Sequence, residues 1–370
     1  PARPLLIVHV IHHLHIGGME NGLVNLVNPL PRDRLRHAIV CIEDSSDFAR
    51  RIERDDVQVY EMHRSKVGVW RLRWNLLQLF RRLRPDIVHT RNMSGLDALL
   101  PARLAGARTI HSEHGFDVDN LRGLASRPMW LRRLHAPWVD DFVCVSKDIR
   151  RLMVGSWRIT ASRIAQIYNG VDTGRFTPAS PPRRDLLPQA WGGEAVFVVG
   201  TVGRLQAVKD QATLLRAADA ACQAQPSLAT RLRVMIVGDG PLRAELQLLA
   251  TSLGLADRCW FAGARDDVAA LMQHFDLFVL TSLNEGISNT VLEAMATGLP
   301  LVVSAVGGNV ELVDSSDVGE TFEPGDASRL AALIQAHADD AALCARRSRA
   351  ARARAEARFS LLAMVAGYEQ

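Results

Sequence analysis

The sequence predicts an α/β protein with two doubly wound domains, each built on a parallel sheet that is covered by helices. Short apolar runs alternate with helix-like segments along nearly the whole chain, a pattern typical of parallel sheets. A proline-rich stretch at 178–188 interrupts the alternation, which then restarts. The length of 370 residues is also long for one hydrophobic core, so we expect two domains that face each other across a central cleft.

The individual elements follow from apolar runs bounded by turn residues, and from apolar positions at helical spacing. The expected strands are 5–11, 38–42, 57–60, 87–89, 109–112, 142–145, 164–168, 196–202, 234–237, 260–261, 277–280 and 301–304. The main expected helices are 19–28, 66–84, 211–224, 242–253, 327–358 and 359–368. The predicted division is a first domain at 1–178, a linker at 179–194, a second domain at 195–355 and a terminal helix at 356–370.

The composition is that of a soluble globular protein, with 48% hydrophobic and 23% charged residues. No apolar run is long enough to span a bilayer, and no secretory signal is visible, so we expect a cytoplasmic protein. The cysteines are odd in number and scattered, which indicates reduced core residues and no disulfide framework or metal site. They are Cys41, Cys144, Cys222, Cys259 and Cys344.

The net charge of +4 is unevenly distributed. Residues 1–180 contain 27 Lys and Arg against 18 Asp and Glu, whereas residues 181–370 contain 17 against 22. The two halves therefore suit different partners. No nucleic-acid-binding motif is present, and the basic residues are interleaved with Trp and Leu, so an anionic membrane surface fits the first half better than nucleic acid does.

The basic helix predicted at 66–84 carries a leucine-rich core face and two tryptophans four residues apart. Packing on the sheet with a solvated basic side would explain the leucines but not the tryptophans. We therefore predict peripheral contact with the inner face of the membrane. The residues assigned to this contact are Trp70, Arg71, Arg73 and Trp74.

Two acidic residues flank a predicted helix start in the second half. Glu285 follows the strand expected at 277–280, Ser288 or Asn289 can cap the next helix, and Glu293 lies about one turn further along. Helix amides suit a phosphate, and carboxylates suit hydroxyl groups. Alternatively, Glu293 stabilises the first turn and Glu285 is merely solvated.

Two cations, Arg204 and Lys209, stand between another strand end and the next helix. Together they suit a pyrophosphate, because hydrogen bonds between charged groups are the strongest. A solvated charge pair is the alternative. Lys209 is one of only three lysines against 41 arginines, which favours a specific role.

Several glycine-containing turns also follow predicted strands, where ligands bind in doubly wound sheets. Gly17-Gly18 would let the backbone approach a ligand at a helix start. The turns at 237–241 and 261–267 offer backbone groups that could contact a base. Each of these turns is about equally well explained as purely structural.

His114 follows the strand expected at 109–112 and could donate to a hydroxyl, although a packing histidine is the simpler interpretation. Asn169 and Asp172 enclose an Asn-Gly turn, for which a hinge and a ligand-binding role compete evenly. Asp117 and Asp119 form an isolated Asp-x-Asp without further metal ligands nearby, so we predict no metal site.

Taken together, these motifs resemble the retaining family-4 glycosyltransferases of the GT-B fold, along nearly the whole chain. Within this family, the chain is similar to the sugar transferases of bacterial exopolysaccharide synthesis. It rests on Gly17-Gly18, Glu113-His114-Gly115, Asn169–Asp172, the Arg204 and Lys209 pair, Gly238–Pro241 and the Glu-x7-Glu segment from Glu285 to Glu293.

The resemblance implies roles for these residues. Arg204 and Lys209 would hold the donor diphosphate, Glu285 and His114 would contact the transferred sugar, and Glu293 would contact the ribose. The remaining donor-binding positions that it implies are Gly17, Gly18, Gly203, Gly238, Ala264, Arg265, Ser288, Asn289 and Thr290. The first domain would bind the acceptor, and the last helix would cross back to it.

The activity implied is transfer of a sugar, with retention of anomeric configuration, from a UDP-sugar or a related nucleotide sugar to a glycan or lipid-linked acceptor. A hexosyltransferase that needs neither a metal nor a cofactor is expected. Two alternatives stay open: a nucleotide-sugar epimerase of the same fold, which would consume donor without an acceptor, and a non-catalytic nucleotide-sugar-binding protein.

Overall fold

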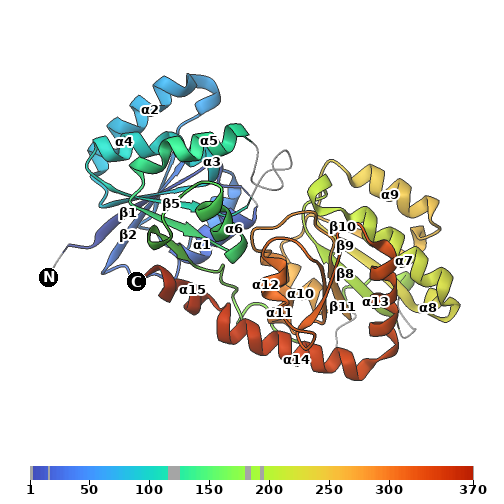
Figure 1. Ribbon diagram of the computed structural model, residues 1–370. Helices are drawn as coiled ribbons and strands as arrows, with labels where there is room; N and C mark the ends of the chain where they lie inside the picture. Colours follow the sequence, from blue (N-terminus) through green and yellow to red (C-terminus); the bar gives the residue numbers. More distant parts are fainter. Residues whose placement is uncertain (1–2, 16, 116–125, 180–184, 192–195, 370) are drawn as a thin grey trace. The chain divides into compact units, whose positions relative to one another are not determined.

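The computed structural model describes residues 3–15, 17–115, 126–179, 185–191 and 196–369. The chain divides into two compact units, and each is considered by itself. Unit 1 comprises Pro1–Gly170 and Met364–Gln370, and unit 2 comprises Val171–Ala363. In both units strands alternate with helices, as predicted, and each unit contains one sheet (Figure 1).

Unit 1 contains a seven-stranded sheet in the order β3-β2-β1-β4-β5-β6-β7, and all of its strand pairs are parallel. The strands are β1 (Leu5–Ile11), β2 (Leu35–Cys41), β3 (Gln58–Glu61), β4 (Ile87–Arg91), β5 (Arg108–Glu113), β6 (Asp141–Cys144) and β7 (Ile164–Gln166). The α-helices are α1 (Gly18–Val27), α2 (Arg64–Leu83), α3 (Asn92–Gly95), α4 (Leu99–Leu104), α5 (Ser126–His135) and α6 (Lys147–Gly155). Because every strand runs the same way, all the carboxyl ends meet at one edge.

The core of unit 1 lies on both faces of this sheet, since successive side chains of a strand point to opposite faces. In β2, Val40 packs with the buried leucines of α2, whereas Ile39 and Cys41 pack with α1. The buried residues of α2 are Leu72, Leu76, Leu77, Leu79 and Phe80, which is the face expected from the sequence. Burial on both faces explains why the strands read as continuous apolar runs.

Unit 2 contains a six-stranded parallel sheet in the order β10-β9-β8-β11-β12-β13. The strands are β8 (Phe197–Val202), β9 (Leu232–Val237), β10 (Cys259–Gly263), β11 (Leu277–Leu280), β12 (Leu301–Ser304) and β13 (Gly319–Phe322). The α-helices are α7 (Gln211–Ala224), α8 (Pro226–Arg231), α9 (Arg243–Ser252), α10 (Val268–Met272), α11 (Asn289–Thr297), α12 (Asn309–Leu312), α13 (Ala327–Asp339), α14 (Ala341–Arg358) and α15 (Leu361–Tyr368), whose last residues belong to unit 1. This order makes β8 and β11 neighbours at the centre.

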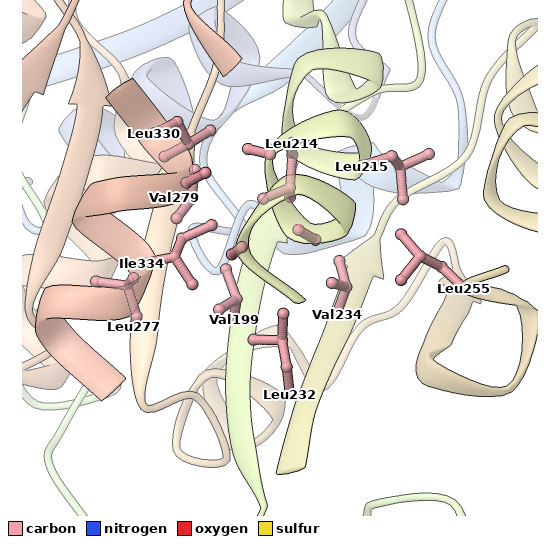
Figure 2. Packing of buried hydrophobic residues seen from close by; sticks show 14 of the residues in the cluster. Val199, Leu214, Leu215, Leu232, Val234, Leu255, Leu277, Val279, Leu330 and Ile334 are labelled. Carbon is pink, nitrogen blue, oxygen red and sulfur yellow. The ribbon is translucent and has the colours of Figure 1, made fainter. Parts of the chain in front are cut away.

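The main core of unit 2 lies between the sheet and helices α7, α9 and α13 (Figure 2). Val199 of β8 and Val279 of β11 project toward this layer, where Leu214 and Ile334 are completely buried. Helix α11 packs against α14. The central strands are therefore buried on both faces, which holds the loops at their carboxyl ends on a rigid base.

Three of the differences from the sequence-based expectation have clear local causes. Strand β13 was not predicted, because Gly319–Phe322 is short and interrupted by a glycine and a glutamate. The segment 327–358 forms two helices, since Asp340 ends the first and its side chain accepts a hydrogen bond from Leu343 N to cap the second. Helix α2 is interrupted at Gly68, where φ is 75° and ψ is 166°.

The two units meet along the chain at Gly170 and Val171, before the proline-rich stretch. Within the predicted linker, Trp191 is buried and donates from Nε1 to the carbonyl of Asp257. The described part of residues 179–194 therefore packs on unit 2. The chain passes from unit 1 to unit 2 at Gly170 and Val171 and returns to unit 1 after Ala363. Val171 N donates to Phe359 O at 2.8 Å, so the segment just after the first crossing lies beside the segment just before the second. Among the described helices, none combines the length and apolar character needed to cross a membrane.

Substituting Gly200 by Ala is expected to destabilise unit 2. A Cβ at Gly200 would lie 2.2 Å from ring atoms of Phe275, so the core must shift, at a cost of about 1–3 kcal/mol. The measurement is the denaturant midpoint of the purified variant. Gly155→Ala is the control, because a Cβ there meets no heavy atom within 4 Å. Equal midpoints for Gly200→Ala and the wild type would contradict the prediction.

Candidate active site

The candidate site in unit 2 is built from loops that follow neighbouring strands at the carboxyl edge of the sheet. The loop after β8 contains Arg204 and Lys209, and the loop after β11 contains Glu285. Leu283 N donates to Val208 O at 2.8 Å, and Thr281 Oγ1 donates to Lys209 O at 2.9 Å. These bonds fix the two loops to each other, so the charged groups that they carry are held close together.

Lys209 and Glu285 form an ion pair across these loops. Lys209 Nζ lies 2.5 Å from Glu285 Oε1, and Ser282 Oγ donates to the same oxygen at 2.6 Å. The two side chains are only 24% and 10% exposed, so solvent screens the pair less than it would a surface pair. Both of these donors bind Oε1 and not Oε2. The structure thus brings together two of the residues predicted for the site.

The turn after β9 packs directly against the loop that carries Arg204. Gly238 and Gly240 both have positive φ, and a Cβ on Gly238 would lie 2.0 Å from Gly203 O. Leu205 N also donates to Asp239 O at 2.9 Å. Glycine is therefore required at Gly238 for both conformation and close approach. This contact explains the Gly-x-Gly-Pro turn structurally and places Gly203 and Gly238 side by side, with the exposed Arg204 beside them.

Helix α11 begins where the sequence predicted. Ser288 is the N-cap, and its Oγ accepts from Val291 N at 3.4 Å. The first turn of a helix directs its N–H groups toward the space before it, where an anion is favoured. Asn289 and Thr290 belong to this first turn and are half-buried, as is Glu293 in the next turn. The helix start thus lies a few residues after Glu285 on the same loop.

The loop before α11 is supported from behind by a second pair of glycines that the sequence analysis did not identify. A Cβ on Gly307 would lie 1.8 Å from Glu285 O, and one on Gly308 would lie 2.2 Å from Gly286 O. Gly308 N donates to Glu285 O at 3.3 Å. The position of the Glu285 backbone therefore depends on the absence of side chains in the loop after β12.

The turn after β10 is joined to the Gly238 turn, because Gly238 N donates to Gly263 O at 2.8 Å. Ala264 and Arg265 follow and are exposed. The Arg265 guanidinium makes two bonds to Asp267, at 2.7 and 2.6 Å. The side chain of Arg265 is thus engaged within its own turn, which leaves the backbone as the group that could contact a base.

In unit 1, His114 follows β5 and is half-buried. Burial, reinforced by the positive charge of Arg91, lowers its pKa to about 3, so the imidazole is neutral at physiological pH. Its Nε2 lies 2.9 Å from Ser112 Oγ, and its backbone N–H donates to Asn92 Oδ1. Among the described residues, Nδ1 has no hydrogen-bond partner. His114 is therefore neutral, with Nδ1 enclosed by the protein.

Glu113 precedes His114 in the same motif but has a structural role. Both of its oxygens accept from Arg132 of α5, at 2.5 and 2.9 Å, and the side chain is completely buried. Burial by itself would raise the pKa of Glu113, but Arg132 and His111 outweigh it and hold the pKa at about 2. The carboxylate is thus ionised and anchors α5 to the end of β5.

Gly17 and Gly18 lie at the start of α1, as predicted, with Gly17 as the extended N-cap. The atom closest to a Cβ on Gly17 would be a carboxylate oxygen of Glu20, at 2.2 Å. The Glu20 carboxylate therefore lies at the start of α1. Nearby, Arg91 ends β4 in full burial, and burial lowers its pKa to about 10, so it stays charged at neutral pH. The sequence analysis did not identify Arg91, which lies in an ordinary strand pattern.

Known protein families match the sequences of both units. The family described as Glycosyltransferase Family 4 matches residues 16–175, and the family described as Glycosyl transferases group 1 matches residues 189–354. The UDP-Gal:alpha-D-GlcNAc-diphosphoundecaprenol alpha-1,3-galactosyltransferase of Escherichia coli is 31% identical over 258 residues, which are 68% of this chain and 66% of that protein. The chain belongs to the family 4, group 1 glycosyltransferases.

Two further similarities agree with this assignment. The putative glycosyltransferase EpsF of Bacillus subtilis is 28% identical over 323 residues, covering 80% of this chain and 78% of that protein. The crystal structure of Anabaena Alr3699/HepE in complex with UDP-glucose matches with a TM-score of 0.83 at 24% identity, over 99% of this chain and 98% of that one. The predicted GT-B fold, with two Rossmann-like α/β units, is thus confirmed, and the protein is a nucleotide-sugar-dependent glycosyltransferase.

The remaining site predictions of this glycosyltransferase fall in different places. Asn169 belongs to unit 1 and Asp172 to unit 2, on either side of the boundary. Asp172 Oδ1 accepts from Gly174 N and Arg175 N, both at 2.9 Å, so its carboxylate is used to close a turn. Asp117 and Asp119 lie outside the described residues.

The surface predicted to contact a membrane is exposed on α2. Trp70 and Trp74 are 81% and 57% exposed, and Arg71 is exposed as well. Arg73 instead bonds to Asp97 at 2.8 Å and lies over the Trp70 ring. Three of the four residues are therefore available for an interface, and Arg73 mainly anchors α2. Other exposed large apolar side chains among the described residues of unit 1 are Leu5, Leu104, Trp130, Leu134 and Val154.

The structure also brings together three possible metal ligands that the sequence analysis did not identify, namely His13, His15 and Asp44. Their ligand atoms all lie within 4.8 Å of one another. A sequence signal existed, because a His-x-His pair in extended backbone places both side chains on one side. The third ligand comes from the loop after β2 and is not apparent from the sequence.

The stability of unit 1 is expected to fall as the pH drops from about 6.5 to about 4.5. Burial lowers the pKa of His37 to about 4 and that of His114 to about 3, and lowers those of His9 and His89 as well. In this window the unfolded chain binds protons that the folded chain does not, so folding loses up to about 1.4 kcal/mol per pH unit and histidine. Glu113 contributes only below its unfolded pKa of about 4.5.

The measurement is urea unfolding at several pH values, followed by a probe in unit 1. His37→Gln should flatten the pH dependence, whereas the half-exposed His63 serves as the control through His63→Gln. A stability of unit 1 that does not change across the window would show that these histidines are protonated in the folded state.

Proposed function

We propose that this chain is a retaining hexosyltransferase that moves a sugar from a UDP-sugar to a hydroxyl of a glycan or lipid-linked acceptor in surface polysaccharide synthesis. The observation that carries the proposal is the Lys209–Glu285 pair, held at the carboxyl edge of the sheet beside the start of α11. UDP is favoured because the Escherichia coli relative is named for a UDP-sugar. The same name supports a lipid-linked acceptor.

The donor would lie along the loops of unit 2. Arg204, Lys209 and the first-turn amides of α11 would hold the diphosphate, because together they concentrate positive charge. Glu285 Oε2 would accept from a hydroxyl of the sugar, and Glu293 would accept from the ribose. The backbone at Gly238 and Ala264 would lie against the base. In unit 1, neutral His114 would hydrogen-bond the transferred sugar, and the loop at Gly17-Gly18 would contribute to donor or acceptor binding.

The transfer step follows from these charges. The bond between the anomeric carbon and the diphosphate oxygen breaks as the acceptor oxygen bonds to the same face of that carbon. The acceptor proton passes to the departing diphosphate oxygen, so retention needs no covalent intermediate. Arg204 and Lys209 stabilise the negative charge that grows on the diphosphate. Cationic groups that the fold already holds in position do this most effectively, because they need not reorganise during the reaction. We therefore propose that the step itself requires neither a metal ion nor a cofactor.

Removing the cation is expected to abolish most of the activity. Lys209→Met should lower transfer by about 10²–10³-fold, the usual cost of losing one group that stabilises transition-state charge. Glu285→Gln should also lower transfer, because it removes the carboxylate that pairs with Lys209 and that we assign to a sugar hydroxyl. The assay follows UDP release and product formation from UDP-galactose and GlcNAc-diphosphoundecaprenol, the pair named for the Escherichia coli relative, and from other UDP-hexoses.

Lys66→Met is the matched control, since Lys66 is exposed on α2 and distant in sequence from the site. A thermal shift with UDP, GDP and ADP identifies the nucleotide independently of the acceptor; a ligand at 100 times its dissociation constant stabilises by about 2.7 kcal/mol. UDP release that requires no acceptor would favour an epimerase or hydrolase. Near-wild-type transfer by both variants would refute the proposed roles.

We further propose that unit 1 attaches peripherally to an anionic membrane, at its cytoplasmic face, through Trp70, Trp74 and Arg71. Trp70→Ala with Trp74→Ala is expected to lower the fraction bound to anionic vesicles in a flotation assay, because interfacial tryptophans and basic residues act together. Leu248→Ala, an exposed apolar position of unit 2, is the control. Equal binding of the double variant and the wild type at low salt would exclude this surface.

A further inference from the structure

His13, His15 and Asp44 converge at the carboxyl ends of β1 and β2. His13 Nδ1 lies 2.6 Å from Asp44 Oδ1, and His15 Nε2 lies 3.0 Å from the same oxygen. The two imidazole rings are stacked with their centroids 4.8 Å apart. Two imidazole nitrogens, which can bind a metal when the rings are neutral, and one carboxylate oxygen thus lie close together.

The backbone positions these side chains by continuing the parallel pairing beyond the two strands. Leu14 N donates to Asp44 O at 3.1 Å, and Ser46 N donates to Leu14 O at 3.2 Å, which forms a bridge between Leu14 and Ser45. Leu14 is completely buried. Since alternate residues of extended chain point to opposite sides, His13 and His15 both point away from the core, toward Asp44. A packed leucine and two backbone bonds therefore hold the arrangement.

We propose that His13, His15 and Asp44 bind one divalent transition-metal ion, for which Zn²⁺ and Co²⁺ are suitable probes. Ligands placed about 2.0–2.2 Å from a tetrahedral ion lie roughly 3.3–3.6 Å apart. The two nitrogen–oxygen separations, 2.6 and 3.0 Å, would open by several tenths of an ångström, and the two ring nitrogens lie within 4.8 Å of each other. Imidazole nitrogens with one carboxylate suit zinc, cobalt, nickel or iron, whereas calcium and magnesium take oxygen ligands.

The surroundings leave this set open on one side. The three side chains are 35%, 46% and 49% exposed, so they can adjust and the remaining coordination positions are accessible to water or to a ligand oxygen. Glu43, the nearest other acid in sequence, is used elsewhere, because its carboxylate accepts from the backbone N–H and Oγ of Ser65. His12 contacts the edge of the His13 ring, at 4.1 Å between centroids.

A bound ion would join the loop before Gly17 to the loop after β2. His15 is two residues from Gly17, the N-cap of α1. The ion would therefore stabilise the approach of the chain to α1 in unit 1. It takes no part in the departure of the diphosphate that we assign to Arg204 and Lys209, and it does not depend on that assignment.

The experiment is a cobalt titration of the full chain, purified without a polyhistidine tag and dialysed against EDTA. The expected result is saturable uptake of one Co²⁺ per chain, with visible d–d absorption that an equivalent of Zn²⁺ removes. His15→Ala and Asp44→Asn should weaken uptake by more than about 100-fold, since even partners outside the first shell change affinity by 10–100-fold. Zn²⁺ should also raise the melting temperature of the wild type but not of the variants.

His63→Ala is the matched control, because His63 is 42% exposed and lies 3.5 Å from Glu61 but belongs to no such three-residue group among the described residues. Its uptake should equal that of the wild type. The metal-free variants should have the same melting temperature as the metal-free wild type, which would show that they fold. An intense thiolate-to-cobalt band would instead assign the ion to a cysteine. That band, absence of one-to-one uptake, or uptake unchanged in both ligand variants would overturn the proposal. No nucleotide or sugar enters these measurements, so their outcome is separate from that of the transferase test.

Discussion

The ion pair between Lys209 and Glu285 is the interaction on which the candidate site of unit 2 depends. The two residues are 76 positions apart in sequence, yet they meet because β8 and β11 are neighbours in a parallel sheet. The pair is partly buried and shares its carboxylate oxygen with Ser282, so neither charge is exposed without a partner. The pair therefore presents a fixed cation at the carboxyl edge of the sheet, which is the feature on which our proposal for diphosphate binding rests.

The glycines around this pair serve the same end. Gly238 against Gly203, and Gly307 against the Glu285 backbone, are contacts that a Cβ would prevent. They allow four loops to pack without side chains between them, which brings backbone groups and charged side chains into a small volume. Packing of this kind limits loop motion and so reduces the entropy that binding must overcome.

Unit 1 contains a buried positive charge, Arg91, instead of an ion pair of this kind. Its carboxyl edge contains the fully buried Arg91 among histidines whose pKa values burial keeps low. The arginine stays charged while His9, His89 and His114 stay neutral, so the interior of unit 1 holds one positive charge here in place of several. The exposed histidines beside it, His13 and His15, face Asp44 instead, which is the chemistry of a metal site.

The sequence by itself determined the alternation of strands and helices and the GT-B fold class, because these depend on local periodicity and on short motifs. It also singled out Lys209 and Glu285, which the structure brings together. It did not indicate β13, whose four residues lack an apolar run, or the break at Asp340. The function of Glu113, the role of Gly307 and the meeting of His13 with Asp44 were decided by tertiary structure. In each case the decisive partner lies on another loop or, for Glu113, on helix α5, and only the packing of the folded unit brings it into contact.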